Sequence, residues 1–292
     1  MRKGRSSLTA AAVAAARALA SSTRAAVLDP QDREAERMLP RPLSLLVQAL
    51  REGDAGRGWL AAAASSVSLG MVDHVALRSA IIDRLVGRAV EAGTRQVVIV
   101  GAGLDTRAYR LEALRHASVY EVDHPDSQRE KLARTAGLPR VAGSLSHVSL
   151  DLSAGGLRAR LADAGHRDAE PSLFIAEGLV PYLECTAITS MLREIALASA
   201  DGSVLLLTYV TPDLVWLRHA RAFVLASMRL IGEPFHSTFS RQQMRETLET
   251  AGFELQQDTD THDWARELCE HPSRQPLIAY ERLAVARKAA NP

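Results

Sequence analysis

Several features are scarce in this chain of 292 residues, and each scarcity excludes a class of protein. Two cysteines, Cys185 and Cys269, are too few for a disulfide framework and fit no metal-ligand spacing. We therefore expect reduced thiols, no metal site and a cytoplasmic protein. The formal net charge is +1 and no basic stripe is visible, so the sequence carries no electrostatic signature of nucleic-acid binding.

Long apolar runs are also missing, although hydrophobic residues make up 47% of the chain. No run reaches the roughly 18 residues that span a bilayer, so no membrane segment is expected. The start of the chain, Met1–Arg5 followed by Leu8–Ala20, looks superficially like a signal peptide. Its apolar part is mostly alanine and is interrupted by Arg17, which predicts an amphipathic or capping helix instead.

The most informative stretch places a short β-favouring segment directly before two glycines. Val97–Val100 leads into Gly101-Ala102-Gly103, and a helix-compatible segment, residues 104–111, follows. This order predicts a buried parallel strand that turns into a helix, the place where open α/β sheets bind an adenosine-type ligand. Thr106 occupies the position of the third glycine of a dinucleotide fingerprint, and Asp105 lies beside it. The added negative charge disfavours a pyrophosphate, so an adenosine cofactor with an amino-acid tail fits better than NAD.

Acidic residues recur at the ends of the segments that are predicted as strands. These segments cover residues 97–100, 117–123, 147–150, 172–177 and 203–209. Glu121 and Asp123 lie on one face of the second strand, and an acid at its end is where ribose hydroxyls are held. Asp151 follows the third strand and Glu177 ends the fourth. Acids at successive strand ends predict a ligand site at one edge of the sheet.

The order of elements predicts one α/β domain over residues 1–292. Strands and helices alternate over 96–210, which predicts a mainly parallel, Rossmann-like core covered on both faces. We expect a helical N-terminal cap in 1–92 with a clear helix over 72–90, and a C-terminal sheet edge in 246–292. Its strands are predicted at 253–256 and 277–285, which gives a seven-stranded sheet.

Residues 211–245 are predicted to form a helical insertion that is rich in large side chains. These are Trp216, Phe223, Met228, Phe235 and Phe239, in a chain with 4% aromatic residues. Two interpretations stay open. The side chains pack within a helical hairpin, or the insertion is a lid that forms the wall of a substrate pocket, where aromatic rings exclude water.

Five segments together resemble one known family. They are residues 98–111, 120–125, Lys131, Asp151-Leu152 and 176–183. In order and spacing they resemble the leucine carboxyl methyltransferase family, including its bacterial secondary-metabolism branch of S-adenosyl-L-methionine-dependent O-methyltransferases. The resemblance covers about residues 70 to 210 and implies a class I methyltransferase fold.

The resemblance also implies contacts with S-adenosyl-L-methionine. It places Gly101 and Gly103 along the methionine part, Asp123 at the ribose, Asp151 and Leu152 on either side of the adenine, Glu177 near the methionyl amine and sulfonium, and Arg78 at the carboxylate. Lys131 is expected on a solvated helix face.

The chemistry of the acceptor depends on whether a base is present. A carboxylate is already ionised at neutral pH, whereas a phenol or an alcohol needs a base. The candidate bases are His124, His219, His236 and His262. None is expected beside Glu177, which favours a carboxylate acceptor. Tyr182, and secondarily Tyr209, is a candidate hydrogen-bond donor to the acceptor.

The sequence therefore predicts an O-methyltransferase that acts on a carboxylate or hydroxyl of a small, natural-product-like metabolite. It is compatible with a homo-oligomer. Two alternatives stay open: methylation of a protein C-terminal carboxylate, and a non-catalytic S-adenosyl-L-methionine-binding protein that serves as a sensor or partner subunit.

Overall fold

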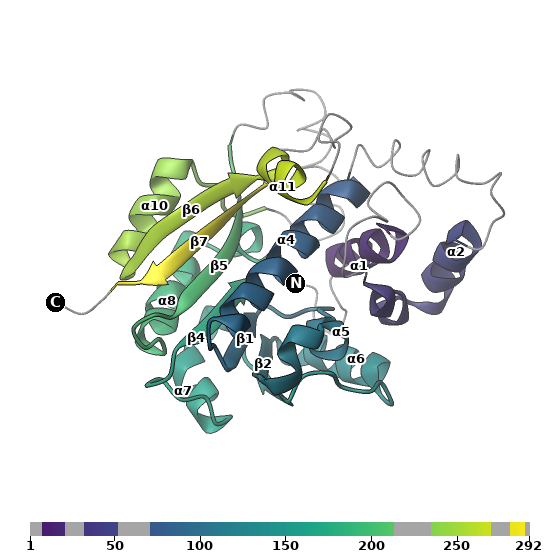
Figure 1. The fold of residues 1–292 in the computed structure, drawn as a ribbon, viewed down its shortest axis with the longest axis horizontal. Coiled ribbons are helices and arrows are strands. Elements are labelled where there is room, and N and C mark those ends of the chain that lie inside the picture. Colours follow the sequence, from purple (N-terminus) through teal and green to yellow (C-terminus); the bar gives the residue numbers. More distant parts are fainter. Residues whose placement is uncertain (1–7, 21–31, 52–70, 213–234, 270–280, 290–292) are drawn as a thin grey trace.

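The computed structural model describes residues 8–20, 32–51, 71–212, 235–269 and 281–289, whose strands form a seven-stranded sheet (Figure 1). The strands are β1 (Gln96–Val100), β2 (Ser118–Asp123), β3 (Ser144–Ser149), β4 (Ser172–Ala176), β5 (Val204–Val210), β6 (Phe253–Asp260) and β7 (Glu281–Lys288). Their order is β3-β2-β1-β4-β5-β7-β6, and β7 runs antiparallel between β5 and β6. The other neighbouring pairs are parallel. The predicted α/β class and the five predicted core strands are confirmed.

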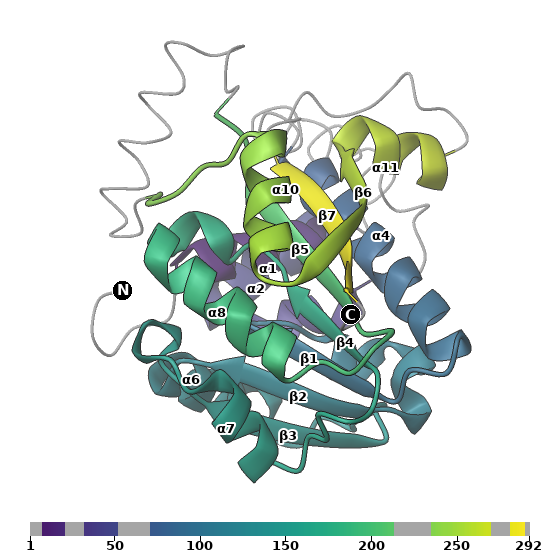
Figure 2. The same ribbon diagram turned by 90° about the vertical axis from the view of Figure 1, so that its left-hand side faces the viewer.

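Helices cover both faces of this sheet, as the continuous apolar character of β1 requires. Val97 and Ile99 face one core, and Val98 and Val100 face the other. The first core is closed by α4 (Met71–Glu91) and α11 (Thr261–Leu268), and the second by α7 (Leu157–Asp163), α8 (Cys185–Leu197) and α10 (Arg241–Thr250). Figure 2 shows these two helical layers on opposite sides of the sheet.

The N-terminal cap consists of α1 (Leu8–Ala20), the 3-10 helix η2 (Arg33–Met38) and α2 (Arg41–Arg51), and it lies beside the sheet in Figure 1. It has a small core of its own, to which Leu104 from the glycine loop contributes. The helix expected at the start of the chain is therefore present. The predicted helix over 72–90 is α4, which packs directly on the sheet. The division of the chain into cap, core, lid and sheet edge stays a prediction.

The helix after the glycine loop is shorter than predicted. Instead of covering residues 104–111, α5 covers Arg107–Arg110, and the 3-10 helix η4 (Glu112–His116) follows. Asp105 N donates to Ala102 O at 2.8 Å, which makes a tight turn before the helix. Leu104 is withdrawn into the core of the cap, so tertiary contacts replace the first helical turn. The next helix along the chain, α6 (Pro125–Thr135), begins directly after β2.

At the C-terminal edge, β6 and β7 pair with each other as predicted, but they are not joined by a tight hairpin. β6 continues to Asp260, whose side chain starts α11 in a capping box with Asp263. β7 begins at Glu281, and residues 277–280 of the predicted strand lie outside the described residues. A helix, α11, therefore lies between β6 and β7 in the sequence.

The predicted lid is only partly described. Residues 213–234, with Trp216, Phe223 and Met228, lie outside the described residues. The end of the predicted insertion, from residue 241, belongs to α10 and packs on the sheet through Met244 and Leu248. These two residues lie four positions apart and face the core, so this part is a covering helix and not a lid.

Among the described residues, no helix is long and apolar enough to cross a membrane.

Two glycines give a matched test of the backbone packing. A Cβ on Gly143, just before β3, would lie 2.9 Å from the backbone oxygen of Arg115. A Cβ on Gly87, within α4, would meet nothing within 4 Å. We expect Gly143→Ala to lower the free energy of unfolding by about 1–3 kcal/mol, because backbone atoms must move. Gly87→Ala should raise it by about 0.5–1 kcal/mol through helix propensity. Urea unfolding measures both, and an unchanged midpoint for Gly143→Ala would contradict this packing.

Candidate functional site

The glycine loop after β1 is held close to three other parts of the chain. Gly101 and Gly103 have φ values of +69° and +46°, in the region that favours glycine. Gly101 N donates to Val122 O at 2.8 Å, which ties the loop to β2. A Cβ on Gly101 would lie 2.9 Å from Leu179 Cδ1, and one on Gly103 would lie 3.9 Å from Ala10 of α1. The loop is therefore fixed at the carboxyl ends of the parallel strands, which we call the carboxyl edge.

Asp123 is the last residue of β2, and its carboxylate accepts a hydrogen bond from the glycine loop. Its Oδ2 accepts from Gly103 N, and its Oδ1 accepts from His124 N at 2.6 Å. Burial raises the pKa of Asp123, while the two backbone N–H donors and nearby cations oppose the rise. The structure thus brings together Asp123 and the two glycines, as the predicted cofactor site requires.

Glu121, on the same strand, is not part of this edge. Its carboxylate is buried, with Oε2 2.6 Å from Nζ of Lys131 on α6 and 3.4 Å from Nδ1 of His147. The prediction of a solvated Lys131 is therefore wrong. Lys131 is 1% exposed because α6 packs on the sheet and its long side chain reaches the buried acid.

Glu177, directly after β4, lies between two buried arginines. Its Oε1 accepts from Arg78 Nε and its Oε2 from Arg107 Nη2, both at 2.8 Å. Burial alone would raise the pKa of Glu177, but the charges of Arg107 and Arg78 hold it well below its ordinary value. The side chain is therefore an ionised, hydrogen-bonded carboxylate and a poor proton acceptor.

Arg107 joins three carboxylates from different elements. Its Nε donates to Asp83 Oδ1 at 2.6 Å, its Nη1 pairs with Asp105, and its Nη2 donates to Glu177. The side chain is 1% exposed, and its pKa is raised despite burial by these three acids. Each guanidinium nitrogen already serves a carboxylate, so Arg107 organises the site and is not placed to hold a ligand.

This arrangement changes the meaning of Asp105. The sequence suggests a negative charge that repels a pyrophosphate, but the Asp105 carboxylate is buried against Arg107. That electrostatic argument against a dinucleotide is therefore wrong. Thr106, at the position of the missing third glycine, donates its hydroxyl to Asp32 Oδ2 at 2.6 Å.

Arg78, on α4, differs from Arg107 in one respect. Its Nε donates to Glu177, and its Nη1 donates to both carboxylate oxygens of Glu281, at 2.9 and 2.7 Å. Within the described part of the chain, Nη2 makes no hydrogen bond. The guanidinium lies 3.9 Å from the position of a Cβ on Gly178, so the absence of a side chain there leaves space beside it. Arg78 thus keeps donor capacity at the predicted site.

A second ion-pair group connects the cap to the same edge. Arg110 donates to Asp83 Oδ2 at 2.7 Å and lies 3.3 Å from Asp32, which also pairs with Arg17 of α1 at 3.3 Å. Arg17 Nη2 donates to Leu104 O at 2.6 Å. Charged groups from α1 and from the start of η2 therefore fix the cap against the glycine loop.

The residues predicted at the adenine follow β3 at the same edge. Asp151 is exposed and caps the 3-10 helix η5 (Leu152–Ala154), where Ser153 N and Oγ donate to it at 2.9 and 2.6 Å. These bonds lower the pKa of Asp151. Leu152 is partly buried against the main core. Their role at the adenine stays a prediction.

Tyr182 ends the 3-10 helix η6 (Val180–Tyr182), which follows Glu177. Its ring meets that of Phe235 edge-on, with centroids 5.5 Å apart, so a residue from the predicted insertion packs on η6. Tyr209 is different, because its hydroxyl donates to Asp258 of β6 at 2.9 Å. Burial and the Asp258 charge raise its pKa, and it belongs to the sheet edge.

The candidate bases are dispersed. His124 caps α6, and His262 is exposed on α11. His236 lies beside η6, with Nδ1 2.8 Å from Glu184. His219 lies outside the described residues. None of these three candidates, His124, His236 and His262, pairs with Glu177, whose carboxylate pairs with Arg78 and Arg107.

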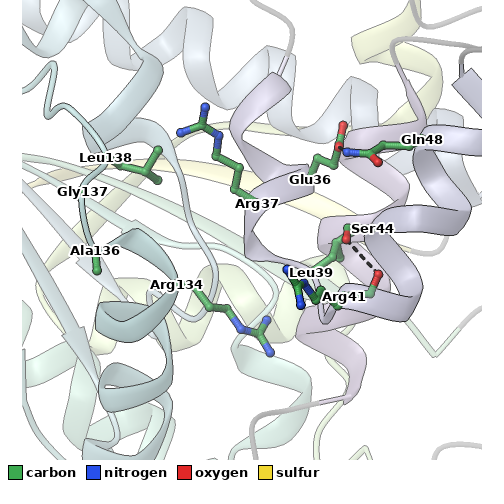
Figure 3. Close-up of a pocket in the computed structure, with 10 residues that line it drawn as sticks. All are labelled: Glu36, Arg37, Leu39, Arg41, Ser44, Gln48, Arg134, Ala136, Gly137 and Leu138. Atoms are coloured by element: carbon green, nitrogen blue, oxygen red, sulfur yellow. Dashed lines mark hydrogen bonds between the residues drawn. The ribbon is translucent and has the colours of Figure 1, made fainter.

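A separate cavity of about 380 Å³ lies between η2, α2 and the end of α6 (Figure 3). Arg37, Arg41 and Arg134 line it together with Glu36 and Gln48, and none of the predicted site residues does. Within the described ranges, no group of three or more histidine, cysteine or acidic side chains is arranged to hold a metal ion.

The network around Arg107 and Glu281 was not predicted from the sequence. Its partners lie far apart along the chain: Arg78 is separated from Glu177 by 99 in residue number and from Glu281 by 203. No short-range pattern in the sequence predicts pairs between such distant residues. A signal that the sequence does contain is Arg107 itself, a charged residue four positions after Gly103.

Comparison with known structures supports the fold. A DUF574 family protein from Streptomyces avermitilis superimposes with a TM-score of 0.61 at 16% identity and covers 94% of this chain and 96% of its own. A putative methyltransferase from Thermobifida fusca gives a TM-score of 0.54 at 18% identity, with 94% of each chain covered. The predicted Rossmann-like class I methyltransferase fold is confirmed.

Sequence relatives are more similar over shorter stretches. A putative S-adenosyl-L-methionine-dependent methyltransferase from Mycobacteroides abscessus is 40% identical over 133 residues, 46% of this chain and 43% of that protein. One from Saccharopolyspora erythraea is 36% identical over 197 residues, 67% of this chain and 64% of that protein. The chain thus matches less than two thirds of the length of these relatives.

The family model of leucine carboxyl methyltransferase matches residues 10–196, which include most of the cap, the glycine loop, Asp123, Asp151 and Glu177. The chain therefore belongs to the leucine carboxyl methyltransferase family.

Proposed function

We propose that this protein is an S-adenosyl-L-methionine-dependent O-methyltransferase that acts on a small metabolite, with a carboxylate as the preferred acceptor. The observation that carries the proposal is the convergence of Gly101, Gly103, Asp123, Arg78 and Glu177 on the carboxyl edge. The cysteine usage supports a cytoplasmic location. The proposal involves neither nucleic acid nor a membrane.

The residues present fit the cofactor. The two glycines leave the loop without side chains, so a ligand can approach its backbone. Asp123 has a carboxylate at the strand end where ribose hydroxyls are held. Arg78 Nη2, which has no hydrogen bond to the described residues, would pair with the methionine carboxylate, and ionised Glu177 would attract the methionyl amine. Asp151 and Leu152 would flank the adenine.

The protein's own groups would act by positioning. Bound S-adenosyl-L-methionine would supply an electrophilic methyl group, which would pass from its sulfur to the acceptor oxygen and leave S-adenosylhomocysteine. Tyr182 would donate a hydrogen bond to the acceptor, and its contact with Phe235 helps to exclude water. Glu177 cannot serve as the base, because two arginines hold its pKa low. A carboxylate acceptor needs no base, which is why we prefer it.

The product distinguishes an ester from an ether. We incubate the full chain with methyl-labelled cofactor and a panel of carboxylic acids, phenols and a peptide with a free C-terminus. Mild alkali should release the label from the product, and kcat should stay flat from about pH 6 to 8. An alkali-stable product, with a rate that rises with pH, would contradict the carboxylate preference. Labelling of the peptide alone would favour a protein acceptor.

A non-catalytic binding protein would bind the cofactor and transfer no label to any acceptor. The Asp123→Ala variant serves as the matched blank, because it should lose cofactor affinity and therefore label transfer as well.

A further inference from the structure

Glu281, the first residue of β7, pairs directly with the Arg78 guanidinium. Both of its carboxylate oxygens accept from Arg78 Nη1, at 2.9 and 2.7 Å. Oε2 also lies 2.7 Å from His74 Nε2, and His74 Nδ1 lies 2.8 Å from the hydroxyl of Thr261. The side chains of Arg78, Glu281 and His74 are 7%, 8% and 1% exposed. A chain of contacts therefore runs from Thr261 of α11 through His74 of α4 to Glu281 of β7, which pairs with the Arg78 guanidinium.

These contacts fix the orientation of Arg78. Glu177 holds Nε on one side, and Glu281 holds Nη1 on the other. With two positions of the planar guanidinium held, Nη2 has a fixed direction. The charge of Arg78 counteracts burial and lowers the pKa of Glu281 to about 2, so this acid stays ionised across the physiological range.

We propose that Glu281 is a positioning residue for recognition of the cofactor's amino-acid tail, and that His74 and Thr261 hold it in place. This inference rests on the proposed function, because it requires that Arg78 Nη2 meets the methionine carboxylate. The family match ends at residue 196, so Glu281 and Thr261 add a C-terminal contribution to a site that is otherwise built from the matched region.

Glu281 could instead compete with the cofactor's carboxylate for Arg78, and this role predicts the opposite effect on ligand affinity. If Glu281 only competes with the ligand for Arg78, its removal frees the guanidinium, and ligands with a carboxylate bind more tightly. If Glu281 positions Arg78, its removal lets the guanidinium turn toward Glu177, and such ligands bind more weakly. Ligands without the tail are insensitive to either effect.

The test compares two ligands by calorimetry on the full chain. S-adenosylhomocysteine has the amino-acid tail, whereas 5′-methylthioadenosine has the adenosine and the sulfur without it. We expect Glu281→Ala to raise the Kd of S-adenosylhomocysteine about ten-fold, the scale of one charge-assisted hydrogen bond. The Kd of 5′-methylthioadenosine should change by less than about two-fold. Arg287→Ala, at an exposed position of the same strand, should leave both constants unchanged.

Three further variants test whether the effect is specific to the contact between Glu281 and Arg78. Glu281→Gln keeps the side-chain volume and one acceptor oxygen, so it should fold where Glu281→Ala does not and lose about three-fold for the tailed ligand alone. In a double-mutant cycle, Arg78→Met and Arg78→Met/Glu281→Ala should bind S-adenosylhomocysteine equally, because Glu281 acts through Arg78.

The outcomes separate the two proposals. If the unmodified chain binds neither ligand, the proposed function fails and the inference fails with it. If it binds S-adenosylhomocysteine and the Glu281 variants bind it equally well or more tightly, only the inference is overturned. Equal losses for both ligands, or additive losses in the cycle, assign Glu281 a general structural role and also overturn it.

Discussion

Arg107→Ala is expected to lower the free energy of unfolding by about 3–5 kcal/mol, the cost of removing one partner from a buried ion-pair group. Arg107 is 1% exposed and forms ion pairs with Asp83, Asp105 and Glu177. Without it, three carboxylates gather with too little positive charge in a place that excludes water. Urea unfolding followed by circular dichroism measures the effect.

The matched control is Arg115→Ala. Arg115 also pairs with an acid, Glu112, but both side chains are more than 60% exposed. Exposed pairs contribute at most about 1 kcal/mol, so this variant should unfold almost as the unmodified chain does. Where Arg107→Ala does not fold, Arg107→Met keeps most of the volume and should still lose stability. Equal stability of the Arg107 and Arg115 variants would contradict the central role of Arg107.

Asp123→Ala is expected to weaken binding of S-adenosylhomocysteine by about ten- to a hundred-fold. The variant removes an acceptor for the ribose hydroxyls and also the carboxylate that holds Gly103 N and His124 N. Both effects concern the adenosine half of the ligand, so 5′-methylthioadenosine should lose affinity to a similar degree. Calorimetry with both ligands measures this.

The control for Asp123 is a nearby carboxylate outside the loop. Asp126, in the first turn of α6, pairs with Arg129 at 3.1 Å. Asp126→Ala should leave both dissociation constants within about two-fold, since its partner Arg129 is 74% exposed and such a pair is weak. An unchanged constant for Asp123→Ala would mean that the ribose is held elsewhere.

The parts of this fold that the sequence predicted are those with local signals. The apolar segment before Gly101 identifies β1, because a strand buried on both faces has no polar alternation. The acids Asp123 and Glu177 each close a short apolar segment, so their place at the carboxyl edge follows from strand direction alone.

The parts that could not be predicted depend on contacts between distant residues. Lys131 looks like a solvated residue until α6 is placed over Glu121. Glu281 reads as an ordinary strand residue until β7 is paired antiparallel with β5, which places it beside Arg78. The short α5 has the same cause, since Leu104 is taken into the core of the cap. In each case tertiary packing overrides a local pattern.

The central claim is that the carboxyl edge binds S-adenosyl-L-methionine through Asp123 and Arg78. The most direct measurement is a crystal structure of the chain with S-adenosylhomocysteine. We expect the ribose hydroxyls at Asp123, and the tail carboxylate at about 3 Å from Arg78 Nη2. A ligand bound away from this edge, for example in the arginine-lined cavity between the cap and α6, or a tail that points away from Arg78, would contradict the account.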